Sequence, residues 1–221
     1  FRRDVETDGR RAVVSFSDDI TDDARRRDFT MNAMYARPDG QVVDPLGGLD
    51  DAKSRRVRFI EDADLRIRED YLRTLRFFRF VAWYGAPEHG FDADALDAVA
   101  RNREGLSTLS AERVGSEILK LLSAPDPAPA VAAMRQTGVL MQVLLGSDDR
   151  WLAPLVHVES MLSLPADPLR RLAIIGGEDV AKRLRLSNAH TRQLALYTAG
   201  MSGSESAKAL GFLHGSETAL G

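Results

Sequence analysis

The stretch from Glu69 to Arg79 combines charged and apolar side chains at a spacing suited to molecular recognition. If it forms one helix, its charged side chains gather on about one third of the circumference, because successive residues turn by about 100°. These residues are Glu69, Asp70, Arg73 and Arg76. Guanidinium groups donate hydrogen bonds in a planar fork and carboxylates accept them, so this face can pair with itself or read the edge of a nucleobase. Periodicity alone favours the self-paired face and leaves the other interpretation open.

A second group, from Arg26 to Met34, places two guanidiniums beside a carboxylate. Arg27 and Asp28 suit a ribose triphosphate, because arginine pairs with phosphate and aspartate accepts from a ribose hydroxyl. Phe29 and its apolar neighbours would anchor the segment in the core. The plainer alternative is a helix end whose arginines match the helix dipole, and spacing alone favours that alternative.

Two further motifs suggest positioning roles. In Asp44-Pro45-Leu46-Gly47-Gly48, a glycine pair permits positive φ and close backbone approach, which indicates a tight turn or a hinge. It is not a phosphate-binding loop, because no Gly-Lys-Ser/Thr follows. The segment from Ser110 to Lys120 predicts a helix with Ser110 as N-cap and Glu112 in its first turn, and we interpret it as structural.

Metal-binding candidates are weak in this chain. Asp92 and Asp94 are placed to open a helix, whereas Asp62 and Asp64 are expected in a charged linker. The four histidines are scattered, and none has a second ligand at metal-binding spacing. The sequence therefore predicts no metal site within these residues.

The secondary-structure pattern predicts a mainly α fold, with a small mixed α/β part followed by helices. Residues 1–16 read as a hairpin that turns at Asp8-Gly9. We expect more strands upstream, because two strands alone bury too little surface. A polar stretch that Ser17 or Asp18 would cap, an apolar stretch of helical spacing over 29–35 and a strand over 41–44 come next. The helices are predicted at 67–84, 92–101, 110–122, 127–136, 151–161, 167–175, 178–184, 188–199 and 204–211.

Composition excludes several classes of protein. The 221 residues carry a net charge of −3 and no cysteine, which excludes a disulfide scaffold and a thiolate metal site. Of the 30 basic residues only four are lysine, and most of the arginines suit a salt-bridged surface. No apolar run reaches membrane-spanning length and no signal peptide opens the chain, which predicts a cytoplasmic protein. Because the chain starts at Phe1, we interpret it as an internal piece of a longer protein.

Four motifs in this order resemble those of the class II tRNA nucleotidyltransferases, the family of bacterial CCA-adding enzymes and of the poly(A) polymerases that share their head. The resemblance is good over residues 1–123 and looser beyond, as at Leu184-Arg185-Leu186-Ser187-Asn188. The motifs are Arg26-Arg27-Asp28-Phe29-Thr30-Met31-Asn32-Ala33, Asp44-x-x-Gly47-Gly48, Glu69-Asp70-x-x-Arg73-x-x-Arg76 and Glu112-Arg113.

The resemblance implies roles for individual residues. Arg27 and Asp28 match contacts to the phosphates and ribose of an incoming nucleotide, and Asp70 with Arg73 match the pair that hydrogen-bonds the base edge of CTP or ATP. Glu69 matches a residue that orients the arginine. Arg76 and Arg79 match further nucleotide-contacting arginines. Gly47 and Gly48 match a hinge between head and neck, and Glu112 and Arg113 match a neck-stabilising motif.

The resemblance also implies an activity, the transfer of CMP and AMP from CTP and ATP to the 3′ end of tRNA. In the family, catalytic carboxylates that hold two Mg²⁺ ions lie upstream of the position of Arg26, and neither Asp4 nor Asp8 has the expected setting. We therefore expect no catalytic residue here and no nucleotide addition by the chain alone. Poly(A) polymerase, a partial CCA-adding enzyme and a non-catalytic helical RNA-binding module remain alternatives.

Three regions follow from this interpretation. Residues 1–60 would be the remnant of a nucleotidyltransferase head, 61–124 a helical neck with the nucleotide-selecting helix, and 125–221 a helical body that binds tRNA. The expected partners are tRNA and nucleoside triphosphates, with no membrane association.

Overall fold

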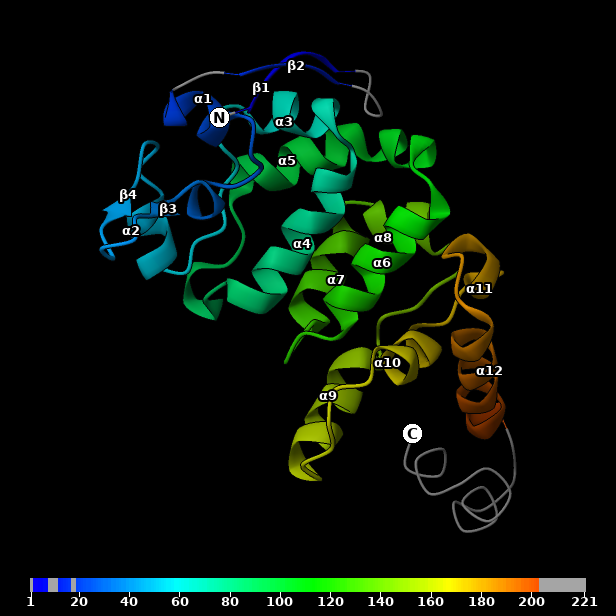
Figure 1. Cartoon of the computed structure of the whole chain (residues 1–221). Coiled ribbons are helices and arrows are strands. Elements are labelled where there is room, and N and C mark those ends of the chain that lie inside the picture. Colours follow the sequence, from blue (N-terminus) through cyan, green and yellow to red (C-terminus); the bar gives the residue numbers. More distant parts are fainter. Residues whose placement is uncertain (1, 8–11, 17–18, 203–221) are drawn as a thin grey trace. The chain divides into compact units, whose positions relative to one another are not determined.

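The computed structural model describes residues 2–7, 12–16 and 19–202. It divides into two compact units, Phe1–Thr108 and Leu109–Gly221, and each is described by itself. Both are built mostly from helices, which confirms the predicted mainly α fold class (Figure 1). The division into head, neck and body at 60/61 and 124/125 stays a prediction.

The β-structure of the first unit consists of two small antiparallel pairs. Strand β1 (Arg2–Thr7) pairs with β2 (Ala12–Phe16) as predicted, with a bulge between Asp4 and Glu6. The expected turn at Asp8-Gly9 lies outside the described residues. Strand β3 (Tyr35–Ala36) pairs with β4 (Val42–Val43), which agrees with the strand expected over 41–44.

Short helical elements link these strands. Helix α1 (Ile20–Arg25) begins after Asp19, whose carboxylate accepts from the Thr21 amide; the caps expected at Ser17 and Asp18 lie outside the described residues. The apolar stretch 29–35 is not a full helix but a 3₁₀ turn, η1 (Thr30–Asn32), followed by β3. Helix α2 (Gly48–Lys53) starts after Gly47, which adopts φ 71°.

The single helix predicted over 67–84 is wrong, because the helix is interrupted near its start, at Asp70. Helix α3 (Ala63–Glu69) ends at Asp70, which is extended at φ −154° and ψ 105°, and α4 (Leu72–Tyr84) starts two residues later. The Asp70 carboxylate accepts from the Leu72 amide and so stabilises the start of the new helix. The charged residues of this stretch therefore do not share one helical face. Asp62 and Asp64 are also not in a linker, since Asp62 caps α3 by accepting from the Leu65 amide and Asp64 lies in the first turn of that helix.

Aromatic side chains form the core of the first unit. Phe29, Phe59 and Phe77 are buried, with ring centroids 5.0 Å apart for the first pair and 5.5 Å for the last. Helix α3 packs along α5, as Figure 1 shows. The unit is completed by η2 (Pro87–His89), α5 (Ala93–Asn102) and η3 (Arg103–Thr108). Hydrogen bonds from Arg66 and Arg73 to the carbonyls of Arg25 and Arg26 link the region of the break to the segment that precedes η1.

The second unit is helical over its described residues, and the helices predicted there are confirmed to within a few residues at their ends. Helix α8 was not predicted, since five residues after Gly138 carry too little periodicity. Helix α10 packs against α6 and α12. The helix predicted at 204–211 lies outside the described residues. The helices are α6 (Ala111–Leu122), α7 (Ala128–Gln136), α8 (Val139–Val143), α9 (Leu152–Met161), α10 (Pro168–Ile175), α11 (Val180–Arg183) and α12 (Asn188–Ser202).

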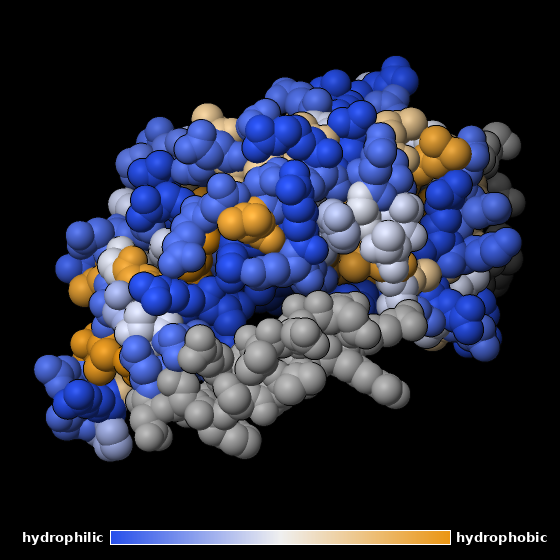
Figure 2. All heavy atoms as spheres, turned by 90° about the horizontal axis from the view of Figure 1, so that it is seen from above, coloured by the Kyte–Doolittle hydropathy of each residue, from blue (hydrophilic) through white to orange (hydrophobic). Residues whose placement is uncertain are grey.

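The exterior is mostly hydrophilic on the face drawn in Figure 2, where hydrophobic residues form small separate patches. Within the described residues, no helix combines the length and the apolar character needed to cross a bilayer.

Candidate functional site

Asp28 is the buried centre of the charged cluster. It is 5% exposed, and one carboxylate oxygen accepts from the Phe29 amide at 3.0 Å and from Asn32 Nδ2 at 2.9 Å. The other oxygen receives Arg76 Nε at 2.5 Å from helix α4. Burial raises the pKa of Asp28, but the Arg76 charge and these hydrogen bonds together hold it below its usual value. An ionised Asp28 thus ties the segment 26–32 to α4.

Asp23, on helix α1, organises the two arginines that precede Asp28. Its carboxylate accepts from Arg26, from Arg27 Nη2 at 3.2 Å and from the Tyr35 hydroxyl at 2.6 Å. The Arg27 guanidinium lies 4.9 Å from the centre of the Tyr35 ring and donates to the Asn32 carbonyl at 3.0 Å. Burial raises the pKa of Asp23, and the hydrogen bonds from Tyr35 and the arginines outweigh it and lower that pKa. The predicted phosphate-contacting Arg27 is therefore held in one orientation.

Arg73 joins the break between α3 and α4 to the same segment. Its Nη1 donates to Glu69 at 2.5 Å and to the Arg66 carbonyl at 2.9 Å, and its Nη2 donates to the Arg26 carbonyl at 2.8 Å. Glu69 forms an ion pair with Arg73, the residue that the family resemblance says it orients, and holds Arg66 through a second ion pair of 2.5 Å. The self-paired arrangement of these charges is therefore what the structure displays.

The other predicted nucleotide-contacting residues lie beside this cluster. Asp70 sits at the break itself and accepts from the Leu72 amide at 3.1 Å. The guanidiniums of Arg76 and Arg79 lie 5.4 Å and 4.8 Å from the centre of the Phe80 ring. Both guanidiniums thus make a cation–π contact with the same ring, that of Phe80 on α4.

The glycine pair at 47–48 makes a close backbone contact. Gly48 is buried, and a Cβ there would lie 2.0 Å from the Thr30 carbonyl oxygen, so only glycine fits. Asp44 caps helix α2 by accepting from the Gly48 and Leu49 amides, both at 2.8 Å. Burial raises the pKa of Asp44, and these amides lower it below its usual value. The described contacts fasten α2 to η1; the hinge role of Gly47 and Gly48 stays a prediction.

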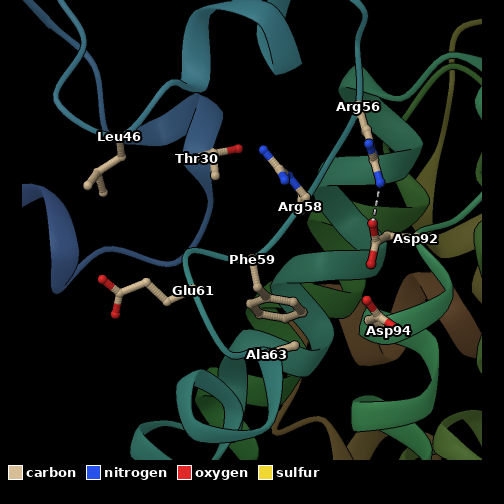
Figure 3. Close-up of a pocket in the computed structure, with 9 residues that line it drawn as sticks. All are labelled: Thr30, Leu46, Arg56, Arg58, Phe59, Glu61, Ala63, Asp92 and Asp94. Atoms are coloured by element: carbon tan, nitrogen blue, oxygen red, sulfur yellow. Dashed lines mark hydrogen bonds and ion pairs between the residues drawn. The ribbon is translucent and has the colours of Figure 1, made fainter.

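A cavity of about 350 Å³ lies near this contact, but the predicted nucleotide-contacting residues do not line it (Figure 3). Arg56 pairs with Asp92 across one side at 2.9 Å, and the Arg58 side chain extends toward Thr30. Arg58 is held by Asp51, which also accepts from the Thr30 hydroxyl at 2.5 Å. The arginines of this cavity thus bind other parts of the fold. The lining residues are Thr30, Leu46, Arg56, Arg58, Phe59, Glu61, Ala63, Asp92 and Asp94.

Glu112 and Arg113, predicted to stabilise the neck, are both exposed on α6. Glu112 lies 3.5 Å from Arg185, and both side chains are more than half exposed. The buried acid of this helix is Glu117, which pairs with Lys120 at 3.4 Å. The neck-stabilising role stays a prediction.

A second arginine–carboxylate cluster, which the sequence analysis missed, is buried in the second unit. Glu159 of α9 accepts from Arg170 at 2.8 Å with one oxygen and from Arg171 at 2.7 Å with the other. Arg171 also donates to the carbonyls of Leu122 and Ala124 at the end of α6. The cluster joins α6, α9 and α10 into one core.

Arg66 and Asp23 were also missed in the first unit. Both lie three or four residues from their partners on a helix, a spacing that could have indicated the pairs. No set of three metal-ligating side chains gathers within the described part of the chain.

Two family models match the chain. The poly(A) polymerase head domain matches residues 1–58, and the probable RNA- and SrmB-binding site of polymerase A matches residues 90–149, so together they cover just over half of the sequence. The mitochondrial CCA tRNA nucleotidyltransferase 1 of Danio rerio is 46% identical over 121 residues, 55% of this chain and 28% of that protein. The CCA-adding enzyme of Geobacillus thermodenitrificans is 37% identical over 136 residues, 62% of this chain and 33% of that protein.

Solved structures share the fold. The Bacillus stearothermophilus CCA-adding enzyme in complex with CTP superposes with a TM-score of 0.68 at 24% identity, over 99% of this chain and 57% of that one. The Thermotoga maritima CCA-adding enzyme complexed with tRNA gives 0.64 at 19% identity, over 91% and 55%. The fold is thus that of a nucleotidyltransferase head segment followed by a helical body. The chain belongs to the family of CCA-adding enzymes and poly(A) polymerases, and it spans less than two thirds of the relatives it matches.

Proposed function

We propose that this chain forms the nucleotide-selecting part of a tRNA nucleotidyltransferase, which adds CMP and AMP from CTP and ATP to the 3′ end of tRNA. Relatives that bear this name, and a solved relative in complex with tRNA, support the proposal. Nucleoside triphosphates and tRNA are the proposed partners, and the cytoplasm is the proposed location.

The observation that carries the proposal is the set of donors left on two arginines of α4. The guanidinium of Arg73 has five N–H groups, and the bonds to Glu69, Arg66 and Arg26 use three of them. Arg76 donates from Nε and one Nη2 hydrogen to Asp28, which uses two. The described contacts leave the other donors to a ligand while the arginines stay oriented. Self-pairing and recognition are therefore compatible on this surface.

This arrangement suits the shared base edge of cytosine and adenine. Both bases present an amino donor next to a ring-nitrogen acceptor, so one carboxylate and one guanidinium satisfy either of them. Asp70 and Arg73, one turn apart at the helix break, supply this acceptor and donor. Guanine and uracil present the reverse pattern and would leave polar groups unpaired, which is how such sites discriminate.

The remaining residues are assigned to the rest of the nucleotide. Arg27 would contact the phosphates and Asp28 the ribose, with Arg76 and Arg79 as further contacts. Mg²⁺ belongs to the proposal as an ion held outside the described residues.

Replacement of Asp70 tests this proposal. In the full-length gene product, we expect Asp70→Ala to lower the preference for CTP over GTP by at least about tenfold, because the base-edge acceptor is lost, while tRNA affinity changes less. The measurement is kcat/KM for each nucleotide with a tRNA primer. Asp97→Ala, which removes an exposed acid of α5, is the matched control. An unchanged CTP preference in Asp70→Ala would contradict the proposal.

A poly(A) polymerase is the second candidate, favoured by the descriptions of the two matching family models. The products of primer extension separate the candidates, because a CCA-adding enzyme stops after three nucleotides whereas a poly(A) polymerase continues with AMP. A partial CCA-adding enzyme would stop earlier. A helical RNA-binding module without catalysis would bind the primer and extend nothing.

A further inference from the structure

Arg66, which the motif-based site assignment does not include, contacts the two parts of the proposed nucleotide site. It lies on α3, with its Nη2 2.5 Å from Glu69 and its Nη1 2.7 Å from the Arg25 carbonyl oxygen. Its side chain is 14% exposed, the same fraction as that of Arg73. Arg66 therefore faces the cluster rather than solvent.

Arg66 and Arg73 form a matched pair around Glu69. Each carboxylate oxygen of Glu69 accepts from one of the two guanidiniums. The same two guanidiniums donate to consecutive backbone carbonyls, Arg66 to that of Arg25 and Arg73 to that of Arg26. Without Arg66, the Glu69 carboxylate would lose one of its two fixed contacts and could rotate away from Arg73. The backbone just before Arg27 would also lose one of its two anchors.

The Nε of Arg66 is buried and has no hydrogen-bond partner within the described structure. A buried donor without a protein partner makes no contact that holds the cluster together. The geometry instead satisfies the two terminal nitrogens that reach Glu69 and Arg25. This arrangement favours a role in placing those two partners.

We infer that Arg66 is a positioning residue for nucleotide selection. Through Glu69 it fixes the guanidinium of Arg73 against the base, and through the Arg25 carbonyl it fixes the turn that presents Arg27 to the phosphates. This inference rests on the proposed function of the site. It assigns Arg66 no contact with the nucleotide itself.

The test compares nucleotide discrimination in variants of α3. We measure kcat/KM for CTP and for GTP with a tRNA primer in the full-length gene product and in Arg66→Ala, Arg66→Lys and Arg68→Ala. Arg68 is the matched control, because it lies on the same helix and pairs with Asp64 rather than with the cluster. The ratio of the two constants does not change when part of the sample is unfolded, so it separates positioning from stability.

We expect Arg66→Ala to lower the CTP-to-GTP ratio between about tenfold and a hundredfold, because a displaced guanidinium no longer meets the base edge. The CTP-to-GTP ratio of Arg66→Lys should fall in between, since one ammonium nitrogen replaces the two guanidinium nitrogens that contact Glu69 and the Arg25 carbonyl. Arg68→Ala should keep the wild-type ratio.

The outcomes separate the two proposals. A wild-type protein that prefers CTP, together with an Arg66→Ala variant that keeps the preference, overturns the role of Arg66 and leaves the proposed function intact. If Arg66→Ala does not fold, a wild-type ratio in Arg66→Lys overturns that role equally. A wild-type protein with no preference for CTP overturns the proposed function and with it this inference.

Discussion

Arginine–carboxylate pairs occur in both units, but they differ in exposure and in how many arginine N–H donors already meet protein acceptors. In the first unit the side chains of Glu69 and Arg76 are 39% and 30% exposed, and Arg73 keeps donors that no described contact uses. In the second unit Glu159 and Arg171 are both 3% exposed. Five N–H groups of Arg171 meet acceptors, at Glu159 and at the carbonyls that follow helix α6.

The difference separates recognition from scaffolding. A guanidinium whose donors all meet protein acceptors has none left for a ligand, so Arg171 can only hold helices together. A guanidinium fixed by some of its donors stays oriented and still offers the rest. The number of used donors, together with burial, therefore distinguishes the two roles where residue type does not.

The largest expected effect tests the scaffolding half of this comparison. Glu159→Ala would leave two buried guanidiniums without a counter-charge, so we expect a loss of about 3–5 kcal/mol in the free energy of unfolding. Urea denaturation at neutral pH measures it. A loss below about 1 kcal/mol would show that water or another acceptor replaces the carboxylate.

Asp28 tests the cluster of the first unit, where it is the buried carboxylate that holds Arg76. Asp28→Asn keeps the shape of the side chain and removes its charge, which should cost about 2 kcal/mol at neutral pH because a charged hydrogen bond to Arg76 is lost. The folded pKa of Asp28 lies below its usual 3.8, so this contribution is full above that value and disappears as the pH falls through the folded pKa. Urea midpoints for both proteins across the acid range check this. A difference that persists unchanged in acid would contradict an ionised Asp28.

Tyr197, in the second unit, gives a test at alkaline pH, as Asp28 does at acid pH. Its hydroxyl donates to Asp167 at 2.5 Å, and burial together with this hydrogen bond raises its pKa from 10.0 to about 12. Tyr197→Phe should cost about 1 kcal/mol at neutral pH. Because the folded pKa is raised, this contribution is present below pH 10 and is lost as the pH rises toward 12. Urea unfolding of both proteins from neutral to alkaline pH measures this contribution. A difference in the free energy of unfolding that does not shrink as the pH rises would contradict the prediction.

The smallest expected effect is at the exposed pair of α6. Glu112→Ala should change the free energy of unfolding by no more than about 0.5 kcal/mol, because the Arg185 contact is solvated on both sides. Thermal and urea unfolding measure it. A loss above about 1 kcal/mol would instead support the neck-stabilising role predicted from the family resemblance.

Much of the helical framework is predictable from local signals. Asp92 and Asp167 cap the starts of α5 and α10, and these starts lie close to their predicted positions. The break at Asp70 was missed because the apolar periodicity continues across it, and only the bond from the Leu72 amide to the Asp70 side chain reveals a new start.

The candidate site was predictable as a set of residue types but not as a set of contacts. The roles of Arg27 and Asp70 follow from motifs, whereas the pairing of Asp28 with Arg76 spans 48 positions and arises only from tertiary packing. Glu159 presents the opposite problem, because a lone acid on a helix reads as a solvent-facing residue until α10 places two arginines over it.

The bond from Arg66 to the carbonyl of Arg25 has a consequence for variation of the sequence. A backbone acceptor is present whatever the side chain, and among the described residues the Arg25 side chain forms its ion pair with the exposed Glu61. Position 25 can therefore change its charge or size during divergence or redesign while the turn stays anchored. A library randomised at this one codon would tune the charge of the surface beside the site without moving the groups that read the nucleotide.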